Sequence, residues 1–327
     1  MQYRTLGKTG LAISVLSFGA GPISTLLVGD ERNRQRAVID HAIERGINWF
    51  DTAATYGGGQ SEANLGRVLH ELGNPPVHVA TKVRLIGDDL SDVGRAVRRS
   101  ITSSLDRLRL PRVTLLQLHN SITLWRGDEP TSVTVADVLD RGGIADVFAD
   151  LRAQGLVTHI GLTGIGHPAA LREVIQSGRF ETMQTPYHLL NPSAGRDIPV
   201  WFDETNYGNV IADCAQAQMG VLAIRVLAGG ALAGNPPSPH TFKTPFFPLD
   251  LYQRDRQRAD RLQQMLGPDR SLVQEAIRFA LSHPQISSAL VGFGETAQID
   301  EALEAITLNA NATDWDQLLV GGTTSFP

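Results

Sequence analysis

The chain is poor in cysteine. Its 327 residues include only Cys214, so no disulfide can form within the chain, and nothing in the composition points to an oxidising compartment. One cysteine also excludes a zinc site built from several thiolates, and the nine histidines show no His-Glu-x-x-His spacing. We therefore predict no metal site and, by default, a cytoplasmic protein.

Excess positive charge and long apolar runs are also missing. The formal net charge is −5, so the chain lacks the basic surface that nucleic acid requires. The opening MQYRTLGKTG is polar and has no apolar core of a secretory signal. The longest apolar stretch, near Val221–Ala233, is rich in glycine and interrupted by Arg225. Such a stretch does not span a membrane, so we expect neither a nucleic-acid partner nor a membrane segment.

Short apolar runs alternate with amphipathic segments along almost the whole chain. The runs lack period-two alternation, which is typical of parallel strands buried on both faces. We expect strands at Val15–Gly19, Asn48–Ala53, Val77–Val83, Thr114–His119, Thr158–Thr163, Thr182–Tyr187, Val221–Val226 and Ala289–Phe293. We expect helices at Arg34–Arg45, Glu62–Leu72, Val93–Leu108, Ile144–Ala153, Ala169–Ser177, Asn209–Gln218, Ser271–Ser282 and Thr296–Ala305.

Strict alternation of eight strands with eight helices favours a parallel sheet, and eight strands close a TIM barrel. The expected fold class is α/β, a (β/α)8 barrel formed by residues 1–327 as one domain, with an open doubly wound sheet as the alternative. TLGKTGLAIS predicts an N-terminal β-hairpin. Two long loops, Ala233–Asp250 and Asn120 to about Gly143, follow the seventh and fourth strands, where loops are often functional. The charged run Arg254–Arg261 indicates a solvated helix face.

Ionisable residues gather at the carboxyl ends of three consecutive predicted strands. Asp51 ends the second strand and Tyr56 follows in its loop, whereas Lys82 ends the third strand and His119 the fourth. Catalytic groups of barrel enzymes lie at this rim. Taken singly, each has an ordinary interpretation, such as capping a turn or packing. Their joint placement favours an active site.

The four residue types fit hydride transfer between a cofactor and a carbonyl carbon. When a carbonyl is reduced its oxygen must gain a proton, which a tyrosine hydroxyl can donate, although the usual tyrosine pKa of about 10 is high for this task. A neighbouring ammonium group, here Lys82, favours the phenolate. Asp51 would hold Lys82 in its charged form, and a neutral His119 could donate to the substrate oxygen. The same set could oxidise an alcohol.

The segments around these residues resemble the aldo-keto reductase family. FDTAATYGGGQSEANLGRVL, YRTLGKTGLAISVLSFGAGPI, VATKV, SLDRLRL and LLQLHN stand in the family's order, and the resemblance covers about Tyr3 to Ala305. It implies a (β/α)8 barrel, a nicotinamide cofactor (NAD or NADP) extended across the C-terminal rim, and no metal. YGGGQSE, HIGLTGI and ISSALVGF resemble the sugar-dehydrogenase branch that includes L-galactose dehydrogenase.

The resemblance also implies cofactor and substrate positions. Gln184 and Thr163 would contact the nicotinamide carboxamide, although Gly164 replaces the usual asparagine. After the seventh strand, Ile224 replaces the family's aromatic residue, and the new Arg225 could reach the pyrophosphate or substrate, or pair with an acid. The expected cofactor set is Gly21, Asp51, Thr163, Gln184, Arg225, Leu227, Gly229, Gly292, Phe293, Gly294, Glu295 and Gln298. The expected substrate set is Tyr56, His119, Trp125 and Tyr187, with Trp201 and the pair Phe246-Phe247 as further walls.

The loop after the eighth strand, VGFGETAQIDEAL, bears on the choice of coenzyme. Members that use NADP carry Lys or Arg there for the 2′-phosphate, whereas this segment has Glu295 and no basic residue. A carboxylate repels a phosphate and can accept hydrogen bonds from ribose hydroxyls. We therefore expect NAD, unless a distant arginine serves the phosphate. Backbone N–H groups of GFGETA, before a helix, could bind a phosphate.

Two other classes of protein remain open beside an NAD(P)-dependent oxidoreductase acting on an aldehyde, ketone or sugar. The first is a non-catalytic, nicotinamide-binding regulatory subunit, because some family members are channel partners. The second is a barrel isomerase or lyase that uses Lys82 as a Schiff-base amine. That chemistry needs a lysine without an adjacent aspartate.

Overall fold

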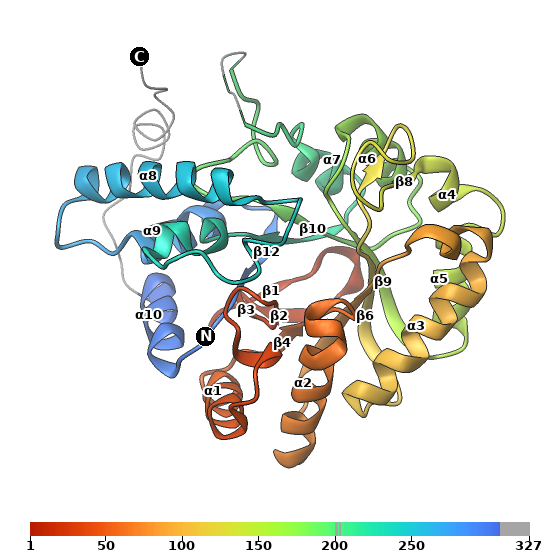
Figure 1. Cartoon of the computed structure of the whole chain (residues 1–327), viewed down its shortest axis with the longest axis horizontal. Coiled ribbons are helices and arrows are strands. Elements are labelled where there is room, and N and C mark those ends of the chain that lie inside the picture. The colour runs from red at the N-terminus through yellow and green to blue at the C-terminus, as the bar shows by residue number, and fades with distance from the viewer. Residues whose placement is uncertain (200–201, 203, 308–327) are drawn as a thin grey trace.

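Eight parallel strands close into a barrel in the computed structural model, which describes residues 1–199, 202 and 204–307 (Figure 1). In spatial order these are β3 (Leu16–Gly19), β4 (Trp49–Asp51), β5 (His78–Val83), β6 (Val113–Leu118), β9 (Val157–Thr163), β10 (Thr182–Pro186), β11 (Gly220–Ile224) and β12 (Ile286–Val291). The barrel closes where β12 pairs with β3. The predicted (β/α)8 barrel is confirmed, and the open sheet is excluded.

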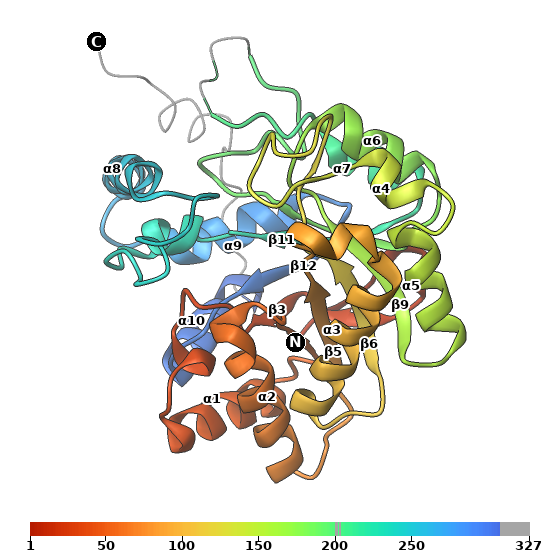
Figure 2. The same cartoon turned by 45° about the vertical axis from the view of Figure 1, so that its right-hand side comes forward.

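Helices surround the barrel and bury their apolar faces against it (Figures 1 and 2). Those that match the predicted helices within a few residues are α1 (Arg32–Glu44), α2 (Gln60–Glu71), α3 (Val93–Leu108), α5 (Ile144–Ala153), α6 (Pro168–Gln176), α7 (Val210–Gln216), α9 (Leu272–Ser282) and α10 (Thr296–Thr307). In α3, for example, Asp92 caps the first turn by accepting from the backbone N–H of Arg95, at 3.0 Å.

The predicted N-terminal hairpin is present and closes the bottom of the barrel. Strand β1 (Tyr3–Thr5) pairs antiparallel with β2 (Ala12–Ser14). Leu6 and Ile13 of this hairpin are buried in a small cluster with Trp49, Leu115 and Leu222 from the barrel strands. The N-terminal end of the barrel is therefore filled with apolar side chains, and its opposite end is left for polar groups.

The elements inside the loop after β6, and the full extent of the helix after β11, were not predicted. The loop after β6 contains β7 (Ile122–Thr123), β8 (Val133–Thr134) and α4 (Val135–Leu139). The segment after β11 forms the turn Ala228–Ala233 and then α8 (Leu249–Leu266), which lies alongside α9 in both views (Figures 1 and 2). The charged run Arg254–Arg261 lies on helix α8, and Arg254 and Asp260 are exposed as predicted, but Asp255, Arg258 and Ala259 of the same run are buried.

The last strand also begins earlier than predicted, at Ile286 rather than Ala289. The start was not predicted because Ser287 and Ser288 are polar, and polar residues are not typical of a strand buried on both faces. Both are buried, and the Ser288 hydroxyl lies 2.6 Å from that of Ser17 on β3. The pair satisfies its hydrogen-bonding groups within the barrel.

Within the described ranges, no helix is both long and apolar enough to cross a membrane. The same residues contain no group of three or more His, Cys, Asp or Glu side chains that could hold a metal ion.

Candidate active site

The structure brings the four predicted residues together. Strands β4, β5 and β6 are neighbours in the barrel, and they place Asp51, Lys82 and His119 at one rim. Tyr56 opens the turn Tyr56–Gly59 that follows β4. Its ring makes an edge contact with the His119 imidazole, with ring centroids 5.7 Å apart.

Lys82 lies at the centre of this group. Its buried Nζ contacts the Asp51 carboxylate, donates to the Thr52 carbonyl at 2.9 Å and lies 3.4 Å from the Tyr56 hydroxyl. Burial opposes the positive charge, but Asp51 and Tyr56 together outweigh it, so the pKa of Lys82 is raised above its usual value. The amine is therefore protonated and paired. A Schiff-base nucleophile needs a neutral amine, so this geometry removes the basis for the lyase alternative.

Asp51 is held by more than the lysine. Its second carboxylate oxygen accepts a hydrogen bond from the Gln117 amide at 3.1 Å and another from the Gln184 amide. Gln117 is a site residue that sequence reasoning missed. Its signal was an amide side chain among the leucines of the strand, two positions before His119, where alternation points both residues to the same side.

The His119 imidazole is kept neutral. Burial, followed by the positive charges of Lys82 and Arg84, lowers its pKa well below the usual value. Its Nδ1 lies 3.5 Å from the Thr55 hydroxyl. A neutral imidazole beside a tyrosine hydroxyl can donate a hydrogen bond to a substrate oxygen without adding another positive charge next to Lys82.

The YGGGQSE segment fixes the position of Tyr56. Gly57, Gly58 and Gly59 all have positive φ, at +58°, +62° and +95°, which lets the chain turn sharply from β4 into α2. Ser61 then bonds the Thr52 hydroxyl and the Ala20 carbonyl, both at 2.8 Å. These bonds tie the start of α2 to the ends of β3 and β4, on either side of the tyrosine.

Apart from Gly21 and Asp51, the predicted cofactor residues lie at or after the ends of β9, β10, β11 and β12, in the other half of the rim. The Thr163 hydroxyl donates to the Leu118 carbonyl at 3.0 Å, and the Gln184 amide group faces Asp51. Arg225 follows β11 with φ +55°, and its guanidinium lies 3.7 Å from the ring centroid of Phe247. A Cβ at Gly229 would come within 3.4 Å of this guanidinium, so glycine leaves space beside the charge.

The segment after β12 carries a feature that the sequence did not reveal. Arg34, from α1, forms an ion pair with Glu295 at 2.7 Å and donates to the Gly294 carbonyl at 2.9 Å. A distant arginine thus lies beside the predicted coenzyme selector. The Gln298 side chain also accepts from the backbone N–H groups of Gly294 and Glu295, at 2.7 and 3.2 Å, so these donors are already used.

Four other predicted residues lie away from this centre or outside the described residues. Tyr187 is 4% exposed and stacks on Phe279 of α9 at 4.9 Å, so it does not form the predicted wall. Phe293 packs in the core against Phe18, so its side chain does not reach a cofactor. Trp125 is 73% exposed in the loop after β7. Trp201 lies outside the described residues.

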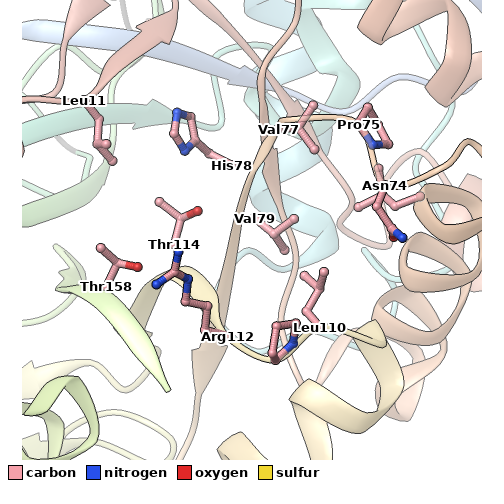
Figure 3. A pocket seen from close by; sticks show the side chains of 12 residues that line it. Leu11, Asn74, Pro75, Val77, His78, Val79, Leu110, Arg112, Thr114 and Thr158 are labelled. Carbon is pink, nitrogen blue, oxygen red and sulfur yellow. The ribbon is translucent and has the colours of Figure 1, made fainter. Parts of the chain in front are cut away.

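A pocket at the opposite end of the barrel does not touch the four central residues (Figure 3). It is lined by His78, Thr114 and Thr158, which stand near the starts of β5, β6 and β9, and by the loop residue Arg112. The N-terminal face of such barrels contributes to stability rather than chemistry.

Comparison with known proteins places the chain in a family. The model of the aldo/keto reductase family matches residues 16–319, so the chain belongs to that family. L-galactose dehydrogenase of Arabidopsis thaliana is 26% identical and covers 94% of this chain and 88% of its own length. D-threo-aldose 1-dehydrogenase of a Pseudomonas species is 28% identical, covering 94% of each chain.

Two further matches are a relative that is named as a channel subunit and a solved structure with the same fold. A probable voltage-gated potassium channel subunit beta of Arabidopsis thaliana is 26% identical over 94% of this chain and 91% of its own. A solved aldo-keto reductase of Bacillus halodurans, in its holo form, is 20% identical, with a TM-score of 0.72 over 99% of this chain and 97% of that one. This likeness shows that the barrel fold is shared.

Proposed function

We propose that the protein is a nicotinamide-dependent oxidoreductase that interconverts a carbonyl compound and the corresponding alcohol. The observation that carries this proposal is the buried chain of contacts from Asp51 through Lys82 to the Tyr56 hydroxyl, beside the neutral imidazole of His119. The family and its dehydrogenase members support the reaction class. A nicotinamide supplies the hydride when it is bound.

In this proposal Tyr56 transfers the proton. When a carbonyl is reduced, the Tyr56 hydroxyl protonates the new alkoxide, and the Lys82 ammonium at 3.4 Å stabilises the phenolate that remains. Asp51 keeps Lys82 charged and directed, and the His119 imidazole donates to the substrate oxygen as charge develops there. In the oxidative direction each proton step is reversed, with the phenolate as the base.

The residues of the other half-rim fit a dinucleotide. Arg225 forms no ion pair within the described part of the chain, and the adjacent Gly229 leaves its guanidinium open to an approaching phosphate. Gln184, which donates to Asp51, connects the expected nicotinamide position with the proton-transfer residues. We propose Arg225 as a contact to the pyrophosphate, and Thr163 and Gln184 as contacts to the nicotinamide.

We further propose NAD as the coenzyme and the cytoplasm as the location. Glu295, held by Arg34, would accept the ribose hydroxyls. Arg34 could serve a 2′-phosphate only by leaving Glu295, which would then repel that phosphate. The sugar dehydrogenases among the relatives favour an aldose or a related hydroxy-carbonyl compound as substrate.

A regulatory, nicotinamide-binding subunit is the second candidate, favoured by the channel-subunit relatives. An intact proton-transfer group does not separate the two candidates, because binding alone would retain it. Turnover separates them.

The test measures binding and turnover in the same preparation. NADH and NADPH are titrated against tryptophan fluorescence, and reduction of an aldehyde panel is followed by the loss of nicotinamide absorbance. We expect binding and turnover in the wild type, and unchanged binding without turnover in Tyr56→Phe. Binding without turnover of any compound in the wild type would favour the regulatory subunit, and absence of binding would contradict both candidates.

A further inference from the structure

Arg84 is a charged residue of the rim that the proposed reaction does not use. It stands two positions after Lys82, just beyond the end of β5, and strand alternation sends both side chains to the same side of the barrel wall. Its guanidinium donates to the His119 carbonyl at 3.3 Å. Arg84 therefore lies directly beside two of the four central residues.

The charge of Arg84 is not neutralised. Among the described residues no carboxylate forms an ion pair with it, and its buried Nε has no hydrogen-bond partner. Burial lowers the pKa of Arg84, partly offset by Tyr56. A buried donor without a partner destabilises the fold. Lys82, by contrast, has Asp51 as its counter-ion.

The contacts around Arg84 leave its donor edge available. The ring of Phe246 lies against the guanidinium, 5.0 Å from its carbon, and this cation–π contact uses the flat face of the group. The N–H donors lie in the guanidinium plane, where carboxylates and phosphates bind in a forked geometry. Within the described part of the chain, these donors make one hydrogen bond, to the His119 carbonyl at 3.3 Å.

The backbone around Arg84 is fixed in place. The Asn120 amide accepts from the Leu85 N–H at 2.9 Å and donates to the Leu85 carbonyl at 2.8 Å. The segment that carries Arg84 is thus bonded to the segment that carries His119. Strand β5 lies four strands from β11 around the barrel, but the loop after β11 brings the adjacent rings of Phe246 and Phe247 onto the guanidinium groups of Arg84 and Arg225, respectively. The Arg84 guanidinium bonds the His119 carbonyl, so a group bound at Arg84 would lie beside the residues proposed to act on the reacting oxygen.

We propose that the substrate carries an anionic group, a carboxylate or a phosphate, and that Arg84 binds it beside the reacting carbon. This inference rests on the proposed function and specifies its substrate class. Arg84 is then a specificity-determining residue that supplies the counter-charge for the anion, whereas Tyr56 and His119 act on the reacting oxygen.

The test compares matched substrates that differ in charge. Succinic semialdehyde is compared with its neutral carboxamide, and glyceraldehyde 3-phosphate with glyceraldehyde, so the two pairs distinguish a carboxylate from a phosphate. We expect kcat/KM to be at least about tenfold higher for the charged member of one pair. Arg84→Met should remove that preference through KM, and Arg84→Lys should keep part of it. Arg99→Met, an exposed arginine of α3, is the matched control and should change neither pair.

A second measurement does not depend on turnover. Calorimetry with succinate and with inorganic phosphate, in the presence of bound nicotinamide, should show binding to the wild type that Arg84→Met weakens at least about tenfold. Equal use of charged and neutral substrates, no binding of either anion, or an equal loss of nicotinamide affinity in Arg84→Met would overturn the proposal. Those results would leave the oxidoreductase standing, because it fails only if nicotinamide does not bind or no carbonyl compound turns over.

Discussion

The two halves of the barrel rim are built in different ways. In the β4–β6 half, Lys82 and Asp51 pair within the rim itself, whereas no carboxylate among the described residues pairs with Arg84. In the β10–β12 half, the charges depend on distant elements, because Arg225 lies against Phe247 and Glu295 pairs with Arg34 of α1. The first half is organised by strand ends, and the second by loops and helices. If the two halves also differ in function, variants in the β4–β6 half should change proton transfer, and variants in the β10–β12 half should change coenzyme binding.

The largest effect is expected at Tyr56. Tyr56→Phe removes the proposed proton donor and leaves the ring in place, so kcat should fall about 10³-fold. Affinity for the nicotinamide should stay within a factor of about two if the two halves act separately. Steady-state kinetics and fluorescence titration measure the two quantities. A matching loss of nicotinamide affinity would contradict the division of the rim.

Lys82→Met tests how far the β4–β6 half depends on its internal ion pair. It leaves the Asp51 carboxylate buried without its counter-ion, so the free energy of unfolding should fall by about 3 kcal/mol. Urea denaturation monitors this change. The double variant Asp51→Asn/Lys82→Met, in which neither charge is buried, should be more stable than Lys82→Met alone. If it is equally unstable, the pair contributes by packing rather than charge.

Asp255, on α8, gives the β10–β12 half a pH dependence. Burial, helped by Glu204, raises the pKa of Asp255 to about 7, although Arg225, Arg258 and Arg254 oppose the rise. Between the unfolded value near 4 and this folded value, the native protein holds a proton that the unfolded chain has released. Stability should therefore fall as the pH rises through this window. Asp255→Asn should abolish that fall and gain about 2 kcal/mol at pH 8.

The measurement for Asp255 is a set of urea unfolding curves from pH 4 to 8. Asp260→Asn, an exposed position on the same helix, is the control and should follow the wild type. Parallel pH profiles for Asp255→Asn and wild type would show that Asp255 titrates normally in the folded protein.

The smallest effect is expected at Glu295. Glu295→Gln removes the carboxylate proposed to disfavour a 2′-phosphate and leaves Arg34 paired with Glu31 alone, so the ratio of NADPH to NADH affinity should rise about tenfold. Arg34→Gln should not produce this rise, because Glu295 would remain charged. Paired fluorescence titrations of the variants measure the ratio. An unchanged ratio in Glu295→Gln would place the coenzyme selector elsewhere.

The β4–β6 half could be read almost completely from the sequence. Asp51, Lys82 and His119 are ionisable residues that interrupt apolar strands, and parallel neighbours bring their carboxyl ends to one rim. The β10–β12 half could not be read in the same way. Tyr187 follows its strand as His119 does, yet it packs against α9. The direction of the Tyr187 side chain depends on its packing against α9, and no local sequence pattern predicts that packing.

The sequence by itself determined the barrel, its eight strand–helix units and the residues of the proposed proton-transfer group, because these follow from local periodicity and from the order of strands along the chain. Tertiary structure alone decided that Arg34 meets Glu295 and that Arg84 meets no carboxylate among the described residues. Such pairings join side chains that are far apart in the sequence. Their presence depends on the angle at which each helix and loop packs on the barrel, and packing of that kind leaves no periodic signal in the sequence.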